Sequence, residues 1–172
     1  MQPLRWPTHD ELYPPERGDW ECIGPLGRLI YVYRWGTKQT RIREFAAKQL
    51  EARTDYDIST WGDDIERQEV VRVLSEEIVR EMRWPNGSFL PEDPVRLLFI
   101  PAGVGDGAEW MVVEFATCKR LGITGRPADR WRPFWDRIRS DPDHAPLYWM
   151  VDVFVAAKQA SAASHPSVPS VQ

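Results

Sequence analysis

Residues 63–82 read DDIERQEVVRVLSEEIVREM, and this stretch decides the fold. Its apolar side chains recur at i, i+3, i+7 and i+11, the spacing of one helix face: Val71, Leu74, Ile78 and Met82. We expect Asp63 to cap the helix, because an N-cap carboxylate followed three residues later by Glu66 is a typical helix start. Charged residues populate the far side, namely Glu76, Glu77, Arg80 and Glu81. The stretch therefore predicts a long amphipathic helix that ends near Met82.

Helical spacing recurs in four other segments: residues 37–53, 108–121, 126–140 and the segment after Pro146. The expected core positions are, in order, Ile42, Phe45, Ala46 and Leu50; Met111, Val112, Phe115 and Cys118; Trp131, Trp135 and Ile138; and Leu147, Met150, Val151 and Phe154. Turn signals separate these segments. The series Trp84-Pro85-Asn86-Gly87 stops one helix, and Gly122 followed by Ile123 is typical of a left-handed C-cap.

Two segments allow two interpretations each. Leu29–Tyr33 is β-branched and aromatic, which favours a short strand, but the same run is compatible with the start of a buried helix. Pro94 either starts one turn of helix or precedes a strand over residues 95–100. The sequence alone leaves both choices open.

The chain is predicted to form one mainly α domain, a compact bundle of four to five helices over residues 26–159, with or without a small β element near residues 29–33. Residues 1–25 are rich in proline, so we expect an extended arm packed down by Trp6 and Trp20. Residues 160–172 are Ala, Ser, Pro and Val with little else, which predicts a disordered tail.

Composition narrows the function classes. The formal net charge of −4 gives no general attraction to nucleic acid or to anionic lipid, so we expect neither as a partner. No apolar run approaches the ~20 residues that span a bilayer, and the N-terminus lacks the apolar region of a secretory signal. Cys22 and Cys118 show no paired spacing, so the sequence predicts neither a zinc site nor a disulfide framework. A cytoplasmic location fits these features.

The closest match to a functional motif is Gly103-Val104-Gly105-Asp106-Gly107-Ala108, a G-x-G-x-x-A string. Glycines in this pattern let a backbone approach a pyrophosphate at a helix N-terminus. Asp106 would put a negative charge in that anion site, and no strand ending in an acid follows at the expected distance. The alternative is a flexible turn with an Asp near a helix start, and we expect no dinucleotide cofactor.

Other titratable residues give no strong signal for chemistry. Asp57, Asp63 and Asp64 surround Trp61 and could be metal ligands, although helix capping explains the latter two more simply. Asp143-His144 reads best as a polar turn ahead of the last helix. We therefore expect no metal site, no catalytic residue and no cofactor.

An arginine-rich aromatic stretch is a candidate binding surface. Its residues are Arg126, Arg130, Trp131, Arg132, Phe134, Trp135, Arg137 and Arg139. Arginines beside aromatic rings bind phosphates, bases or an acidic protein, while the alternative is a solvated helix face over core tryptophans. Asp129 and Asp136 lower the positive charge of the stretch, which disfavours nucleic acid.

Four short motifs between residues 70 and 123 together resemble an acyl-carrier domain. They are Val70-Val71-Arg72-Val73-Leu74, Ser88-Phe89-Leu90-Pro91-Glu92-Asp93, Asp106-Gly107-Ala108 and Leu121-Gly122-Ile123. In that family, phosphopantetheine is attached to a serine directly after the aspartate. This sequence has Gly107 there, and Ser88 lies too early to replace it. The resemblance implies a carrier-like helical bundle that has lost its cargo and presents its second helix to a partner.

Two functional hypotheses follow. The first is a non-catalytic protein-interaction or adaptor module, such as an inhibitor of another protein. Its partner-binding residues would be Asp106, Gly107, Trp110, Arg130, Trp131 and Trp135. The alternative is a small enzyme or ligand-binding protein whose site is assembled from dispersed residues such as Asp106, Glu109, Glu114 and Arg130.

Overall fold

The computed structural model describes residues 1–12, 27–100, 109–124, 131–132, 136–138, 140–141 and 143–164. These residues are mainly helical and contain no strand beyond one isolated bridge between Pro94 and Pro146. The long helices are α2 (Gly27–Glu51), α3 (Ile65–Met82), α5 (Glu109–Arg120) and α7 (Leu147–Ser164). The short ones are α1 (His9–Leu12), η2 (Ile58–Trp61) and α4 (Val95–Leu98). The predicted mainly α fold is therefore confirmed.

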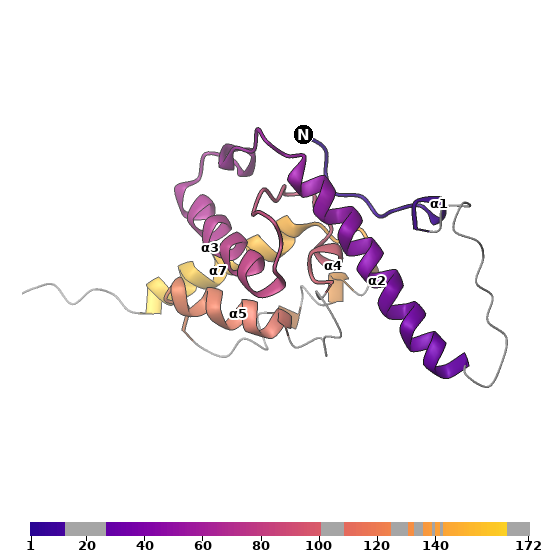
Figure 1. The fold of residues 1–172 in the computed structure, drawn as a ribbon. Helices are drawn as coiled ribbons and strands as arrows, with labels where there is room; N and C mark the ends of the chain where they lie inside the picture. The colour runs from indigo at the N-terminus through magenta and orange to yellow at the C-terminus, as the bar shows by residue number, and fades with distance from the viewer. Residues whose placement is uncertain are drawn as a thin grey trace, which may run out of the picture.

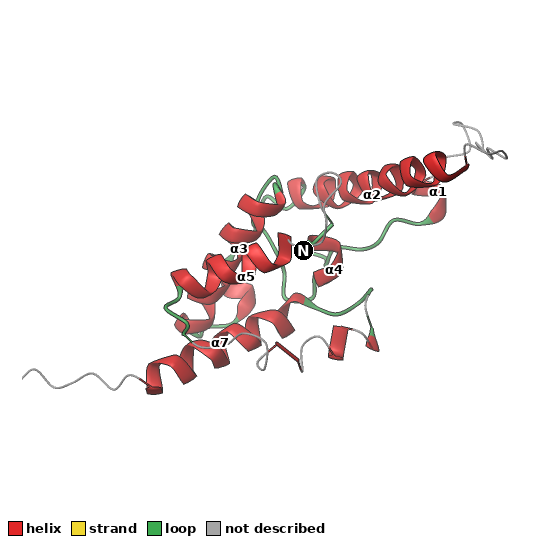
Figure 2. Ribbon diagram, turned by 90° about the horizontal axis from the view of Figure 1, so that it is seen from below, coloured by secondary structure: helices red, strands yellow, loops and turns green. Residues whose placement is uncertain are grey.

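Helix α3 lies at the centre of the arrangement and packs against α5, α7 and η2. Figure 1 shows α3, α5 and α7 grouped together, with α2 running along the other side of the molecule. The same grouping is visible from below in Figure 2. The expected core residues of α3 and α7 are all buried, namely Val71, Leu74, Ile78, Met82, Leu147, Met150, Val151 and Phe154.

The N-cap of α3 is Asp64, so the prediction of Asp63 is wrong by one position. The Oδ1 atom of Asp64 accepts hydrogen bonds from the backbone N–H groups of Glu66, at 2.9 Å, and Arg67, at 3.4 Å. These are two of the donors that a helix leaves unpaired at its start. The Glu66 side chain does not reach back to the cap, because its carboxylate accepts from Gln159 of α7 instead.

Glu77 is fully buried, although the sequence places it on the charged side of α3. Its carboxylate contacts the guanidinium groups of Arg80, one turn further along α3, and of Arg120, at the end of α5. A buried carboxylate is tolerated only when cations and hydrogen bonds compensate the loss of water. The two arginines provide this compensation, and periodicity alone does not reveal it.

Leu29–Tyr33 lies within α2, so the strand interpretation is wrong for this segment. Helix α2 includes most of the predicted helix of residues 37–53, but it begins at Gly27 and ends at Glu51. Aromatic and β-branched residues favour strands only weakly, and continuity with a long helix overrides that preference. Within the described residues, the short segment after Pro94 is also helical, as α4.

Two boundaries near the chain ends differ from expectation. Residues 9–12 of the expected extended arm form α1, because Thr8 and Glu11 make a reciprocal capping box. Helix α7 continues through residues 160–164, which the sequence assigns to a disordered tail. Ser161 is buried and its hydroxyl donates to the Ala157 carbonyl at 2.9 Å, which holds this last turn. Trp20, residues 13–26 and residues 165–172 lie outside the described residues.

Candidate functional site

Helix α5 is amphipathic in the opposite sense to the prediction. Met111, Val112 and Phe115 were expected in the core, but all three are exposed. The side chains that face the core are Val113, Glu114 and Thr117. The predicted stripe is therefore wrong at these three positions, where two polar residues are buried in their place, although its fourth residue, Cys118, is half-buried and packs against the core.

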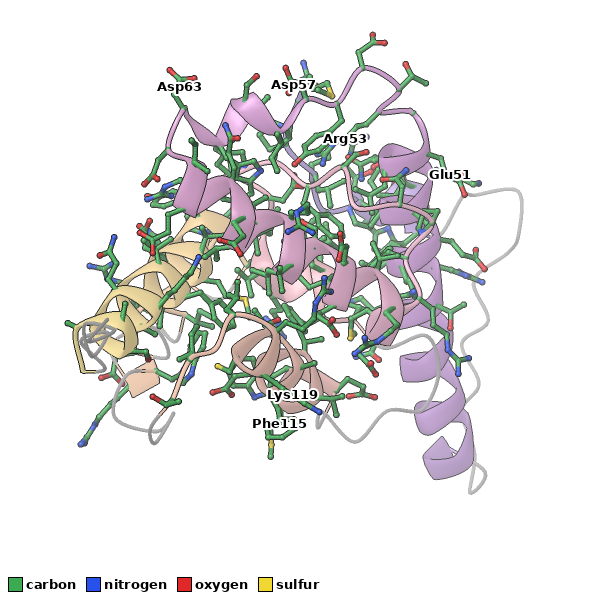
Figure 3. The ribbon with its side chains drawn as sticks, turned by 90° about the vertical axis from the view of Figure 1, so that its left-hand side faces the viewer. Glu51, Arg53, Asp57, Asp63, Phe115 and Lys119 are labelled. Carbon is green, nitrogen blue, oxygen red and sulfur yellow. The ribbon has the colours of Figure 1, made fainter. Side chains whose placement is uncertain are left out.

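The three exposed apolar residues and Lys119 form one continuous strip, which we call the α5 outer face: Met111, Val112, Phe115 and Lys119. Met111 is 59% exposed, Val112 46% and Phe115 72%. Residues three and four apart are neighbours on a helix, so these side chains adjoin one another. Lys119 follows Phe115 by one turn and makes no ion pair within the described chain. Figure 3 shows Phe115 and Lys119 pointing away from the body of the molecule.

Charged contacts fix the C-terminal end of α5 against α3. The Arg120 guanidinium donates to Glu77 Oε1 at 2.8 Å and to Glu76 Oε2 at 2.5 Å. The same contact with Arg120 holds the pKa of Glu76 below its ordinary value. Cations near a helix C-terminus also interact favourably with the helix dipole. The outer face is therefore presented on a helix that is anchored at this end.

Glu114 lies beneath the outer face, on the side of α5 that packs into the protein. Its side chain is 8% exposed, and burial raises its pKa to about 7, an effect that the nearby Trp131 hydrogen bond partly offsets. In the described part of the chain, Glu114 Oε1 and the Thr117 hydroxyl have no hydrogen-bond partner. The carboxyl group thus titrates near neutral pH, but from a buried position rather than from the surface.

Trp131 is a core residue, as its place in the predicted apolar stripe indicates, and its burial leaves little of the ring for the partner contact that was also expected. It is 4% exposed, and its ring lies edge-on to Trp110 at 5.3 Å and to Phe154 at 4.8 Å between centroids. Edge-to-face pairs of this kind add to the stability of a core. Trp110 is half-buried at the start of α5 and so borders both the core and the surface.

Several other predicted residues lie outside the described part of the chain: Asp106, Gly107, Arg130 and Trp135. The G-x-G-x-x-A string and the dispersed-site hypothesis both depend on these positions. Glu109, a further member of that hypothetical site, is half-buried in the first turn of α5.

The acidic residues near Trp61 act mainly as helix caps. Asp57 accepts from the Ser59 backbone N–H at 3.0 Å and caps η2, and Asp64 caps α3. Among the residues that the structure describes, no cluster of three or more His, Cys, Asp or Glu side chains could hold a metal ion. His144 forms an exposed pair with Asp141 at 3.0 Å.

Comparisons with family models, with curated proteins and with solved structures found no match to this chain. Within the described ranges, none of the helices is sufficiently long and apolar to cross a membrane. Among the described helices, α5 exposes three large apolar side chains, Met111, Val112 and Phe115, on one side.

Proposed function

We propose that this chain is a non-catalytic protein-interaction or adaptor module that binds a partner protein through the α5 outer face. The exposure of Met111, Val112 and Phe115 on one helix carries this proposal. A solvent-facing helix side normally carries polar residues, and contiguous exposed apolar side chains commonly mark partner sites. The aromatic ring and the methionine are residue types enriched at protein interfaces.

The shape of the face favours a particular kind of partner. A standard interface buries roughly 800 Å² on each side, which one strip of a 12-residue helix does not supply to a flat surface. A partner with an apolar groove would instead surround α5 and reach the flanks of the helix as well. Lys119, at the end of the strip, would meet an acidic residue at the rim of such a groove.

The acyl-carrier resemblance leads to a second part of the same proposal. We propose that the chain is a degenerate carrier-like domain that has kept partner binding and lost its cargo. Two observations support it: α5 is the helix that the resemblance assigns to partner contact, and Gly122 after α5 has a φ of 68°. Because Gly107 has no hydroxyl, incubation with a phosphopantetheinyl transferase should give no mass increase. A stoichiometric adduct would contradict this part.

A cytoplasmic location is proposed on the cysteine pattern. The two cysteines, Cys22 and Cys118, fall in different segments without paired spacing. Chains that lack a disulfide framework are typical of a reducing compartment.

The experiment that tests the interaction proposal is a quantitative capture of partners from the native host, using the full chain and two variants. The double variant Met111→Ser, Phe115→Ser removes two of the three apolar side chains of the strip. The control, Ile65→Ser, removes an apolar side chain from the start of α3, where Ile65 is 82% exposed. The proposal expects a partner that is retained by the wild type and by Ile65→Ser but lost from the double variant. Equal capture by all three proteins would contradict it.

Self-association is measured in parallel by analytical ultracentrifugation. If the wild type and Ile65→Ser dimerise while the double variant stays monomeric, the partner is a second copy of this chain, and the α5 outer face remains the binding surface. Dimerisation that persists in the double variant would place the contact elsewhere and contradict the proposal.

A further inference from the structure

A second surface feature, distinct from the α5 outer face, lies beside α3. It is a pocket of about 380 Å³ between α3, the segment that leads into η2, and the turn at Gly87. Helix α3 contributes residues at i, i+3, i+4, i+7 and i+8, namely Arg72, Ser75, Glu76, Val79 and Arg80, and the other wall consists of Tyr56, Ile58 and Gly87. In Figure 3 this side of α3 faces the viewer, below the segment that carries Asp57.

Gly87 forms part of the wall opposite α3, where it presents only backbone. A Cβ atom on Gly87 would lie 3.4 Å from Ser75 Cβ and 3.5 Å from Val79 Cγ2, in contact with the α3 wall. The turn itself is held by Asn86, whose amide donates to the Leu50 carbonyl and accepts from the Ser88 N–H, both at 3.0 Å. A methyl group at position 87 would therefore still fit, whereas a larger side chain would crowd Ser75 and Val79 at this wall of the pocket.

The walls of the pocket are mostly apolar, with the Tyr56 ring, Ile58 and Val79 as the main surfaces. Tyr56 is partly desolvated here, which raises the pKa of its phenol above the ordinary value. Small-molecule sites typically combine volumes of about 300–1,000 Å³ with apolar walls and a few polar groups. The pocket is thus larger than one side chain requires and falls within the small-molecule range.

Three charged side chains line the pocket: Arg72, Glu76 and Arg80. Only Arg72 is held by a single long ion-pair contact. Arg120 already holds Glu76 at 2.5 Å, and Arg80 contacts both Glu77 and Glu81. Arg72 meets only one oxygen of Glu76, at the long distance of 3.5 Å, and its side chain is 56% exposed. A guanidinium has five N–H donors and binds carboxylates in pairs of hydrogen bonds. Arg72 therefore has the capacity to bind a second anion.

We propose that this pocket binds a small amphiphilic carboxylate. Its apolar body would lie between Tyr56, Val79 and Gly87, and its carboxylate would accept hydrogen bonds from Arg72 at the mouth. This inference goes beyond the proposed interaction function. It concerns a pocket lined by α3 instead of the α5 outer face, and a small molecule instead of a protein.

The test is a titration of the full chain with octanoate, followed by amide chemical shifts in two-dimensional NMR spectra. The proposal expects saturable shifts centred on Ser75 and Gly87. Octan-1-ol, which has the same chain without the charge, should bind at least ten times more weakly. Arg72→Gln should lower octanoate affinity about tenfold, because a charge-assisted hydrogen bond is lost.

Position 87 offers a matched pair of variants. Gly87→Leu should fill the pocket and abolish the octanoate shifts, whereas Gly87→Ala should keep binding, since its Cβ makes only ordinary contacts. Circular dichroism checks that both variants fold. If Gly87→Leu does not fold, the Arg72→Gln variant still tests the proposal. Unchanged octanoate binding by a folded Gly87→Leu protein, shifts centred elsewhere, or no saturable shift in the wild type would each overturn the proposal. Phe115→Ser should bind octanoate normally, which separates this test from that of the α5 outer face.

Discussion

Asp93 and Arg53 form a bidentate ion pair in the interior of the protein, with Nη1–Oδ2 and Nη2–Oδ1 distances of 2.6 and 2.7 Å. The carboxylate also accepts from the backbone N–H groups of Leu4 and Leu90, and the guanidinium donates to the carbonyls of Gln2 and Ser88. Four N–H donors of the guanidinium and both oxygens of the carboxylate are thus engaged. This pair joins the N-terminal segment, the end of α2 and the loop before α4.

Breaking this pair should destabilise the protein strongly. Asp93→Asn removes the charge that compensates the buried guanidinium, and such changes cost about 3–5 kcal/mol. The matched control is Asp143→Asn, because Asp143 pairs with Arg96 on the surface and exposed pairs contribute at most about 1 kcal/mol. Urea unfolding measures both free energies. A cost for Asp93→Asn as small as that of the control would refute the structural role of the pair.

The helix cap of α3 gives a second matched pair. Asp64→Ala should lower the free energy of unfolding by about 1 kcal/mol, because two backbone N–H groups lose their acceptor. Asp63→Ala should change it by less than about 0.5 kcal/mol, as for an ordinary surface residue. Thermal or urea unfolding of the two variants decides between Asp64 and Asp63 as the cap, and the reverse order of effects would assign the cap to Asp63.

Glu114 should make stability depend on pH. Its pKa is about 7 in the folded protein, against an ordinary value of 4.5, so the unfolded chain releases this proton first. The folded state therefore loses stability as pH rises from about 4.5 to 7, with a total near 3 kcal/mol. Glu114→Gln removes this pH dependence. The free energy of unfolding of the variant, minus that of the wild type, should therefore rise by about 2–3 kcal/mol between pH 5 and pH 8. The same effect of Glu114→Gln on the free energy of unfolding at both pH values would disprove the assignment.

Two aromatic residues should respond in opposite ways to truncation. Trp131→Ala empties a core position beside Phe154 and should cost about 3–5 kcal/mol. Phe115→Ala removes an exposed ring and should change the free energy of unfolding by less than about 0.5 kcal/mol. Urea unfolding compares the two. Similar costs would show that Phe115 contributes to the core and that the α5 outer face is not a free surface.

The helices that could be predicted from the sequence are those whose buried face is mainly apolar, although α3 also buries Ser75 and Glu77. Leu74 and Ile78 of α3, and Met150 and Phe154 of α7, repeat at helical intervals and are buried as expected. In α5 the same reasoning gave the right element and the wrong face, because hydrophobicity alone does not anticipate the burial of Glu114.

Contacts between distant residues account for most of what the sequence did not reveal. Arg53 and Asp93 are 40 positions apart, and nothing in either local pattern indicates that they meet. Arg120 and Glu77 are 43 positions apart, so the compensation of the buried carboxylate depends on how α5 packs against α3. The pocket at Gly87 has the same origin, since its walls come from three separate segments.

The most direct measurement of the central claim is site-specific photo-crosslinking in the native host. A photoreactive amino acid replaces Phe115 in one protein and Ile65 in another, and the crosslinked products are identified by mass spectrometry. We expect a single dominant adduct from position 115, which competition by the unlabelled wild type removes and which is absent from position 65. Equal adducts from both positions, or none from position 115, would contradict the claim that the α5 outer face binds a protein partner.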